Sequence, residues 1–142
     1  MKALIIGASG QVGGTLASLA VRRKIEVYGT SRASKGSPGG RGFLYLDLTD
    51  PASVTAAFEK SRPDLVLLCS AMTHVDGCER DPELARKVNT AGPALVAEEC
   101  RRNGAKLVYF STEYVFDGKG GPYGEEDPVN PVSVYGRTKL EG

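Results

Sequence analysis

The stretch Gly7-Ala-Ser-Gly10-Gln-Val-Gly13 decides the fold of this chain. It follows a short apolar run at residues 3–6 and precedes a helical pattern that begins near Gln11. Glycines at this spacing allow a tight turn, a close approach of the backbone to a diphosphate, and close packing of a helix on a strand. The helix N-terminus adds free N–H groups and a partial positive charge. We interpret the stretch as a strand, a glycine turn and a helix start that bind an anionic dinucleotide; a glycine-rich turn without a ligand is the alternative.

Short apolar runs separated by helical patterns predict buried parallel strands at residues 3–6, 25–28, 43–46, 65–69 and 107–110. Helices are expected from residue 11 to the basic residues 22–24, over 51–60, over 82–103 with a kink at Gly92-Pro93, and over 132–142. Asp50-Pro51, Asp81-Pro82 and Asn130-Pro131 supply the cap-and-proline signals. Residues 34–42 and 117–130 are expected to be loops. The predicted fold is α/β, a Rossmann-type doubly wound parallel sheet with about five strands.

Composition favours small-molecule chemistry in the cytoplasm. The 142 residues suit one domain, and the net charge of +1, with scattered Lys and Arg, gives no reason to expect a nucleic-acid partner. No apolar run approaches membrane-spanning length, so no membrane partner is expected. The three cysteines lack metal or redox spacing, and the single histidine, His74, has no second metal ligand; no metal is expected.

Three motifs, in the same order, carry a family resemblance over nearly the whole chain. The first is the G-x-x-G-x-x-G spacing of residues 7–13, and the second is Ser111-Thr-Glu-Tyr-Val-Phe-Asp-Gly118. The third is Asn130-Pro-Val-Ser-Val-Tyr-Gly-Arg-Thr-Lys-Leu140, which contains a Y-x-x-x-K pair. In these motifs the sequence resembles the extended short-chain dehydrogenase/reductase family, and within it the dTDP-4-dehydrorhamnose reductase branch. Residues 70–79 are also similar to the branch's segment after the fourth strand.

The resemblance implies hydride transfer from a nicotinamide to a ketone, with Thr112, Tyr135 and Lys139 as catalytic residues. Tyr135 would protonate the developing alkoxide, and Thr112 would donate a hydrogen bond to the substrate oxygen. The spacing agrees, because residues i and i+4 share one helix face and a lysine cation lowers the pKa of a nearby phenol. Lys139 would also bind the nicotinamide ribose. A Tyr–Lys pair that only stabilises an exposed helix is the alternative.

NADP(H) is favoured over NAD(H). An acidic residue at the end of the second strand would bind a ribose 2′-hydroxyl, but this position reads Thr30-Ser31-Arg32. Arg32 could pair with a 2′-phosphate, helped by Lys35 or Arg41, or could be a solvated arginine. The expected cofactor-binding residues are Gly7, Ser9, Gly10, Gln11, Val12, Gly13, Arg32, Asp47, Leu48, Ser70, Ala71, Met72 and Lys139. For Asp47, which resembles an adenine-side contact, a plain strand-end cap is an equal alternative.

Three other residues keep open alternatives. Asn89 resembles the family's Asn that ties its helix to the end of the fourth strand, or it is an ordinary exposed helix residue. His74 is a base, a pH switch or a plain loop side chain. Glu113 stands where the branch has Asp, so the resemblance leaves substrate positioning beside Thr112 open.

The leading hypothesis is an NADPH-dependent reductase of a nucleotide-linked 4-keto-6-deoxy sugar. One alternative is a non-catalytic NADP-binding subunit that resembles the regulatory partner of methionine adenosyltransferase; another is an NAD-dependent nucleotide-sugar epimerase or dehydratase. Because the last expected helix lacks a terminating signal, residues 1–142 are interpreted as an incomplete NAD(P)-binding Rossmann domain without its C-terminal substrate-binding region. An uncovered fifth strand would favour a homo-oligomer through its edge.

Overall fold

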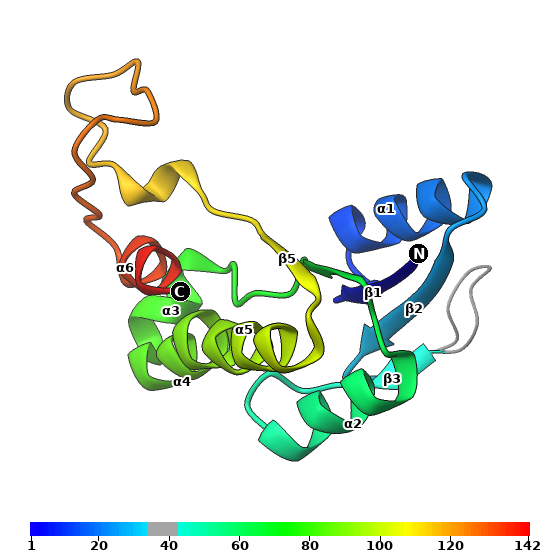
Figure 1. Cartoon of the computed structure of the whole chain (residues 1–142). Helices are drawn as coiled ribbons and strands as arrows, with labels where there is room; N and C mark the ends of the chain where they lie inside the picture. The colour runs from blue at the N-terminus through cyan, green and yellow to red at the C-terminus, as the bar shows by residue number, and fades with distance from the viewer. Residues whose placement is uncertain (34–42) are drawn as a thin grey trace. The chain divides into compact units, whose positions relative to one another are not determined.

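The computed structural model describes residues 1–33 and 43–142, and these include a five-stranded parallel sheet (Figure 1). The strand order is β3-β2-β1-β4-β5, which confirms the predicted Rossmann-type α/β fold. The strands are β1 (Lys2–Ile6), β2 (Glu26–Ser31), β3 (Phe43–Tyr45), β4 (Leu65–Leu68) and β5 (Lys106–Tyr109). The order runs one way from β1 through β2 to β3 and the other way from β1 to β4 and β5, and ligands of such sheets bind where the order reverses. The predicted loop at 34–42 lies outside the described residues.

Strand β1 forms where apolar side chains are covered on both faces of the sheet. In β1, the side chains from Ala3 to Ile6 are at most 2% exposed, and the strand pairs with both β2 and β4. β2 continues to Ser31, three residues beyond the predicted end, because Thr30 pairs with Ile6 and Ser31 pairs with Tyr45. Propensity missed this extension because Gly, Thr and Ser are not an apolar run; the ladders on both sides decide it.

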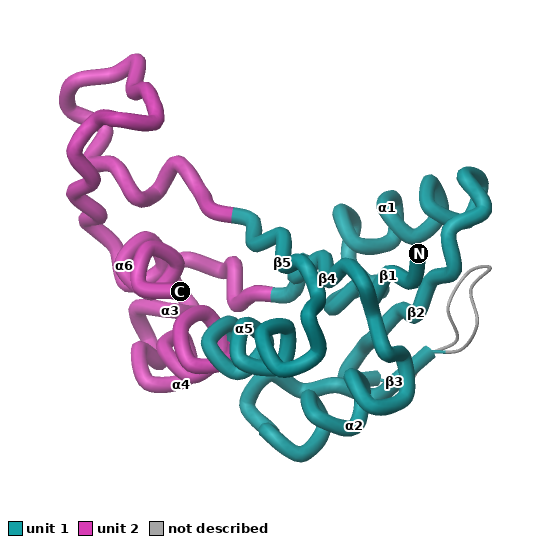
Figure 2. The backbone as a smooth tube through the Cα atoms, viewed as in Figure 1, with its two compact units in different colours: residues 1–70, 93–110 teal, residues 71–92, 111–142 magenta. Residues whose placement is uncertain are grey.

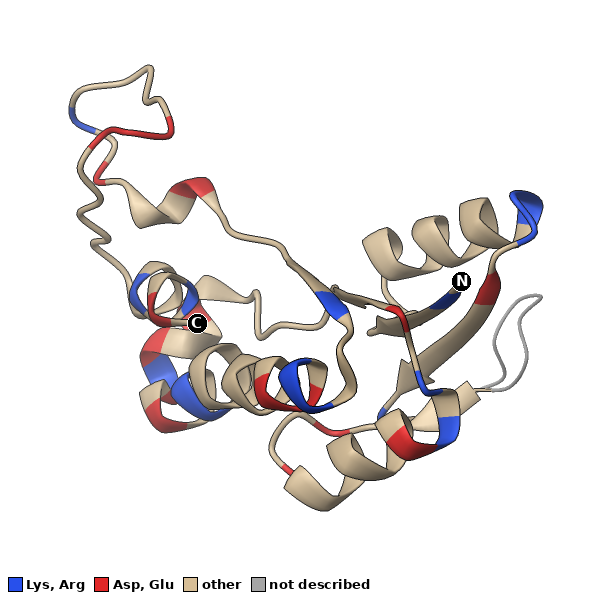
Figure 3. Ribbon diagram, viewed as in Figure 1, with Lys and Arg blue, Asp and Glu red and all other residues tan. Residues whose placement is uncertain are grey.

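Three helices flank the sheet in one part of the chain. They are α1 (Gln11–Arg22), α2 (Pro51–Ser61) and α5 (Gly92–Asn103). Ala17 of α1 packs with Ile5 and Val27 of the sheet. The basic residues that follow the last turn of α1 lie at its C-terminal end, where the helix dipole favours them (Figure 3).

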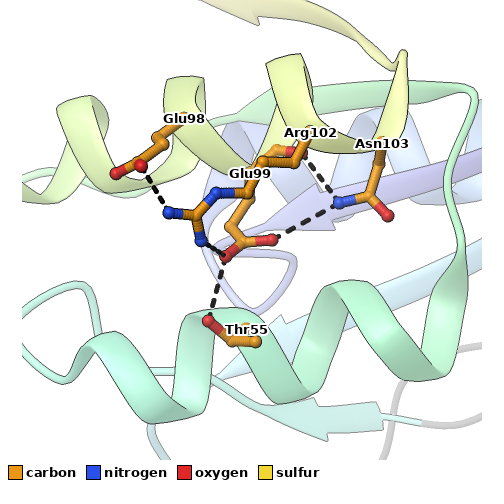
Figure 4. A network of polar contacts seen from close by, with 5 residues as sticks. All are labelled: Thr55, Glu98, Glu99, Arg102 and Asn103. Atoms are coloured by element: carbon orange, nitrogen blue, oxygen red, sulfur yellow. Dashed lines mark hydrogen bonds and ion pairs between the residues drawn. The ribbon is translucent and has the colours of Figure 1, made fainter.

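A buried carboxylate joins α2 to α5. Glu99 is 7% exposed, and its Oε1 accepts hydrogen bonds from Thr55 Oγ1 at 3.0 Å and from the Arg102 guanidinium at 3.1 Å (Figure 4). Asn103 donates to the carbonyl of Glu99 at 2.8 Å, and Arg102 also pairs with Glu98. The charge of Glu99 is therefore compensated where it is buried.

The remaining helices are short. They are α3 (Val75–Arg80), α4 (Pro82–Arg86), the π-helix η1 (Lys87–Ala91), the 3-10 helix η2 (Glu113–Val115) and α6 (Val134–Glu141). The predicted caps are confirmed for α2 and α4, since Asp50 accepts from the amide of Ala52 and Asp81 from that of Leu84. Helix α3 was not predicted, because its six residues lack an apolar stripe.

Two helix predictions need correction. Residues 82–103 are not one kinked α-helix but α4, η1 and α5, with a π turn directly before Gly92-Pro93. Pro93 has no N–H to give to an α turn, and a π turn absorbs such a break. Helix α6 starts at Val134 rather than 132, because Ser133 is its cap and accepts from the amide of Gly136 at 3.0 Å. Asn130 is occupied elsewhere: its amide donates to the carbonyl of Val115.

The chain forms two compact units (Figure 2). Unit 1 contains Met1–Ser70 and Pro93–Phe110, that is, the sheet with α1, α2 and α5. Unit 2 contains Ala71–Gly92 and Ser111–Gly142. Each is described separately below.

Candidate functional site

In unit 1, the glycine loop is packed so closely that side chains are excluded. Gly7 has φ +87°, and a Cβ there would lie 2.9 Å from the Ser70 nitrogen. A Cβ on Gly13 would lie 2.4 Å from the carbonyl oxygen of Gly7. Both contacts involve backbone atoms, which cannot swing away. The glycine spacing therefore has the close helix–strand packing that the sequence predicts.

The first turn of α1 is open to an anion. Its N-cap is Gly10, so no cap side chain occupies the first N–H groups, and the turn contains no acidic residue. Ser9, Gln11 and Val12 are exposed, Val12 to 52%. The start of α1 fits the diphosphate of a dinucleotide, because its N–H groups and the helix dipole favour an anion and its first turn contains no competing carboxylate.

The end of β2 is followed by an exposed cation, Arg32. Thr30 and Ser31 are buried, and Ser31 Oγ accepts from the Ala33 amide at 3.0 Å, whereas Arg32 is exposed. The charge of Arg32 acts on the carboxyl of Asp47. Burial raises the pKa of this carboxyl, but the hydrogen bonds from Thr49 and the charge of Arg32 together lower it by more, so the pKa of Asp47 lies below its ordinary value.

Asp47 also has the cap geometry that the sequence left open. Its carboxylate accepts from the amide and the hydroxyl of Thr49, both at 2.8 Å. Leu48, next to it, is 4% exposed. The cap therefore exists, and an adenine contact by Asp47 and Leu48 stays a prediction. Lys35 and Arg41 fall outside the described residues.

In unit 2, Asn89 holds the segment that contains Ala71 and Met72. Its Oδ1 accepts from the amide of Met72 at 2.8 Å, and its Nδ2 donates to the carbonyl of Met72 at 3.0 Å. Asn89 is 1% exposed, so the alternative of an ordinary exposed helix residue is wrong. Its partner Met72 lies four residues after the end of β4, so Asn89 ties its helix to the segment after the fourth strand rather than to the strand itself. The role of Ala71 and Met72 toward a cofactor stays a prediction.

Thr112 caps η2, and its hydroxyl is engaged by its neighbour. Thr112 Oγ1 accepts from the Tyr114 amide at 3.3 Å and donates to Glu113 Oε2 at 3.1 Å. The longer side chain of Glu113, where the resembled branch has Asp, thus reaches the predicted substrate-binding hydroxyl. A substrate oxygen would have to compete with this carboxylate for the proton of Thr112.

Tyr135 stands on α6 against η2. Its ring meets that of Tyr114 edge to face, with centroids 5.4 Å apart. The contact depends on Gly136, where a Cβ would lie 2.2 Å from the carbonyl oxygen of Tyr114. Glu79 on α3 fixes the start of α6, because its Oε1 accepts from the amide of Val134 at 2.7 Å.

Lys139 is one turn further along α6 and is only 5% exposed. Burial lowers its pKa to about 8, because a charged ammonium is disfavoured away from water. A solvated Lys on an exposed helix would show neither feature, so the plain surface-pair alternative does not describe Lys139. Between the two predicted catalytic residues lies Thr138, which is 1% exposed.

The loop after η2 is organised by Asp117. Its carboxylate accepts from the Tyr123 hydroxyl at 2.6 Å and from the Asn130 side chain at 3.0 Å, as well as from the amide of Lys119. These hydrogen bonds, that of Tyr123 foremost, lower the pKa of Asp117 to about 2. The rings of Phe116 and Tyr123 stack, with centroids 4.5 Å apart. The 117–130 loop thus has an internal structure.

The side chain of His74, for which the sequence left a base, a pH switch or a plain loop residue open, caps a helix. It is the N-cap of α3, and its Nδ1 accepts from the Gly77 amide at 2.8 Å. Within residues 1–33 and 43–142, no group of His, Cys, Asp and Glu could hold a metal ion. The three cysteines are free thiols.

Sequence reasoning missed Thr138, Gly136 and Glu79 as supports of α6. For Gly136 and Thr138 a signal existed, since both lie inside the Y-x-x-x-K motif and Thr138 is three residues from Tyr135, on nearly the same helix face. For Glu79 there was none, because its partner is 55 residues away.

Two sets of predicted residues are thus brought together, each within one unit. In unit 1 the glycine loop adjoins Ser70, and Arg32 is near Asp47. In unit 2, α6 with Tyr135 and Lys139 packs against η2, which Thr112 caps, and against η1, which contains Asn89. A parallel sheet with this strand order and glycine loop defines a Rossmann-type α/β protein.

The comparison with protein families is more specific. The chain belongs to the RmlD substrate binding domain family, whose model matches residues 1–142. A dTDP-4-dehydrorhamnose reductase of Streptomyces griseus is 44% identical over 140 residues, 98% of this chain and 42% of that protein. The methionine adenosyltransferase 2 subunit beta of Xenopus tropicalis is 37% identical over 141 residues, 99% of this chain and 41% of that protein. The chain spans less than half the length of these curated relatives.

Solved structures agree with the fold. A dTDP-4-dehydrorhamnose reductase from Bacillus anthracis, in complex with NADP, matches with a TM-score of 0.85 and 32% identity over 99% of this chain and 46% of that one. A UDP-glucose 4-epimerase from Thermus thermophilus, in complex with NAD, matches with a TM-score of 0.88 and 31% identity over 98% and 47%. No helix among the described residues is long and apolar enough to cross a membrane.

Proposed function

We propose that the protein containing this chain is an NADPH-dependent reductase of a nucleotide-linked 4-keto-6-deoxy sugar, and that residues 1–142 are its NAD(P)-binding part. The observation that carries the proposal is the buried Lys139 one helical turn from Tyr135. Both ends of α6 are held, the first by the hydrogen bond from Val134 to Glu79 and the last by the ion pair of Glu141 with Arg86. Burying an ammonium costs free energy, and buried ionisable groups of this kind cluster at functional sites. A cation beside a reactive phenol is one such function. The 44% identity to a dTDP-4-dehydrorhamnose reductase supports the substrate class.

In the proposed reaction, the chain's residues handle the proton. A bound nicotinamide cofactor would supply the hydride. The Tyr135 phenol donates its proton to the oxygen of the reduced ketone, and the Lys139 ammonium stabilises the phenolate left behind. Thr112 holds the substrate oxygen by a hydrogen bond once its hydroxyl turns from Glu113. The glycine loop binds the diphosphate at the start of α1.

The test is NADPH oxidation by the full-length protein with a dTDP-4-keto-6-deoxy sugar. Tyr135→Phe should lower kcat by at least about a hundredfold, because general acid catalysis contributes about 10²–10⁴-fold. Tyr28→Phe is the matched control: it also removes a hydrogen-bonded hydroxyl, from a strand of unit 1, and should leave kcat unchanged. Equal activity of Tyr135→Phe and wild type would refute the catalytic assignment.

The preference for NADPH over NADH is part of the proposal and rests on Arg32, exposed at the end of a strand whose last residues offer no carboxylate. Arg32→Ala should lower kcat/KM for NADPH by about tenfold or more, since a charged hydrogen bond contributes about 1.5–3 kcal/mol, and leave kcat/KM for NADH nearly unchanged. Arg23→Ala, at the far end of α1, is the charge-matched control. A parallel fall with both cofactors would contradict the phosphate contact.

A second candidate is a non-catalytic NADP-binding subunit, favoured by the 37% identity to methionine adenosyltransferase 2 subunit beta. It predicts that NADPH binds but is not consumed with any keto sugar. A third is an NAD-dependent nucleotide-sugar epimerase or dehydratase, favoured by the likeness to UDP-glucose 4-epimerase. It predicts tightly held NAD and no net oxidation of NADPH.

The cytoplasmic location stays a prediction, as does a homo-oligomer through the edge strand β5, where Val108 is 41% exposed.

A further inference from the structure

A buried hydroxyl lies between the two proposed reactive side chains of α6. Thr138 is 1% exposed, in a helix whose neighbours in unit 2 are η1, η2, α3 and α4. A buried hydroxyl costs free energy unless it is hydrogen-bonded, so its partners are informative.

The hydroxyl of Thr138 is both acceptor and donor. Asn89 Nδ2 donates to Thr138 Oγ1 at 3.2 Å, and Thr138 Oγ1 donates to the carbonyl of Tyr135 at 3.1 Å. The next residue of η1 also binds Thr138, because Thr90 Oγ1 donates to the Thr138 carbonyl at 2.9 Å. Two consecutive residues of the π-helix therefore bind one residue of α6.

The donor side of this arrangement is fixed. The amide oxygen of Asn89 accepts from the Met72 amide, so its nitrogen must point the other way, toward the Met72 carbonyl and Thr138. A rotation or a slide of α6 would break the bond between Asn89 and Thr138, and the loss of one hydrogen bond costs about 0.5–1.5 kcal/mol.

We propose that Thr138 is a positioning residue: its hydroxyl transmits the fixed orientation of Asn89 to the backbone of Tyr135 and so sets the rotation of the Tyr135–Lys139 face. This inference rests on the proposed reductase function. Proton transfer needs a donor within about 2.6–3.2 Å of its acceptor, and a misplacement of about 1 Å can cost about a hundredfold in rate. Thr138 itself touches neither substrate nor cofactor in this proposal.

The experiment compares Thr138→Val and Thr138→Ser in the full-length protein. Val keeps the branched shape and loses the hydroxyl, while Ser keeps the hydroxyl. We expect Thr138→Val to lower kcat about tenfold with little change in KM for NADPH, which corresponds to one lost buried hydrogen bond. Thr138→Ser should recover most of kcat. Thr55→Val is the matched control, because it also removes a threonine hydrogen bond, to Glu99 in unit 1.

Hydrogen exchange of the α6 amides supplies a readout that does not need turnover. Faster exchange over 134–141 in Thr138→Val, with wild-type exchange in Thr138→Ser and Thr55→Val, supports the proposal even if the wild-type protein proves not to be a reductase. Unchanged exchange together with wild-type kcat in Thr138→Val would overturn it. A loss of kcat equal to that of Thr55→Val would also overturn it, since it would reflect general stability.

Discussion

Gly136→Ala tests how closely α6 approaches η2. The added Cβ would lie 2.2 Å from the Tyr114 carbonyl oxygen, 3.0 Å from its carbon and 3.1 Å from Cβ of Pro131. Two of these three atoms belong to the backbone, so the helix itself must move. Forced overpacking costs about 3 kcal/mol at the upper end of its usual range, and the better helix propensity of Ala returns about 1 kcal/mol. We expect a net destabilisation of about 2 kcal/mol.

Urea unfolding followed by circular dichroism measures this loss. With a slope of about 2 kcal/mol per molar urea, the midpoint should fall by about 1 M. The control is Gly124→Ala in the same unit, where a Cβ would lie 3.9 Å from its nearest neighbour and stability should change by less than about 0.5 kcal/mol. If the two variants unfold at the same urea concentration, the close approach of Gly136 to Tyr114 is refuted.

Four further outcomes are expected. Gly13→Ala should weaken NADPH binding in a fluorescence titration by about tenfold or more, because its Cβ would lie 2.4 Å from the Gly7 carbonyl; unchanged affinity would argue against a diphosphate site at the start of α1. Glu99→Ala should lower the free energy of unfolding by about 2 kcal/mol, since its donors lose their acceptor, and a loss below about 0.5 kcal/mol would contradict that. The pKa of Asp117 is lowered to about 2 in the folded protein, from about 3.9 in the unfolded chain, so its stabilisation of the loop is complete above about pH 4 and is lost as the pH falls toward 2. NMR shifts of the Tyr123 ring should follow a titration centred near 2, and one centred near 4 would contradict this. Turnover should fall as the pH rises through about 8, where Lys139 loses its proton, and a profile that stays flat to pH 10 would contradict the role of its charge.

The parts of the fold that depend on local signals could be predicted. The central strands are continuous apolar runs, and Asp50 and Asp81 are caps followed by proline, so type and place agreed with the structure. The end of β2 depends on pairing with Ile6 and Tyr45, which lie far along the chain, and no local pattern contains that information.

In the candidate site, the glycine loop and the Tyr135–Lys139 pair could be found because their spacing alone expresses a geometry. The burial of Lys139 could not, since nothing in its own helix determines what packs on it. The same holds for the bond from Asn89 to Thr138, which joins residues 49 positions apart. Spacing predicts which side chains share a helix face, whereas the residues that pack against that face are known only from the folded unit.

The two compact units are interleaved along the sequence, and this governs how the protein can be made and cut. Unit 1 is complete only once residue 110 has been synthesised, although its first segment ends at residue 70. Unit 2 includes α6, so the hydrogen bond from Asn89 to Thr138 can form only after the last few residues of this stretch have been synthesised. During synthesis, residues 71–92 therefore emerge well before their partners and depend on later sequence for burial. No single cut separates the units: the peptide chain passes between them after residues 70, 92 and 110, so a break at any one point leaves a segment of at least one unit on the wrong fragment.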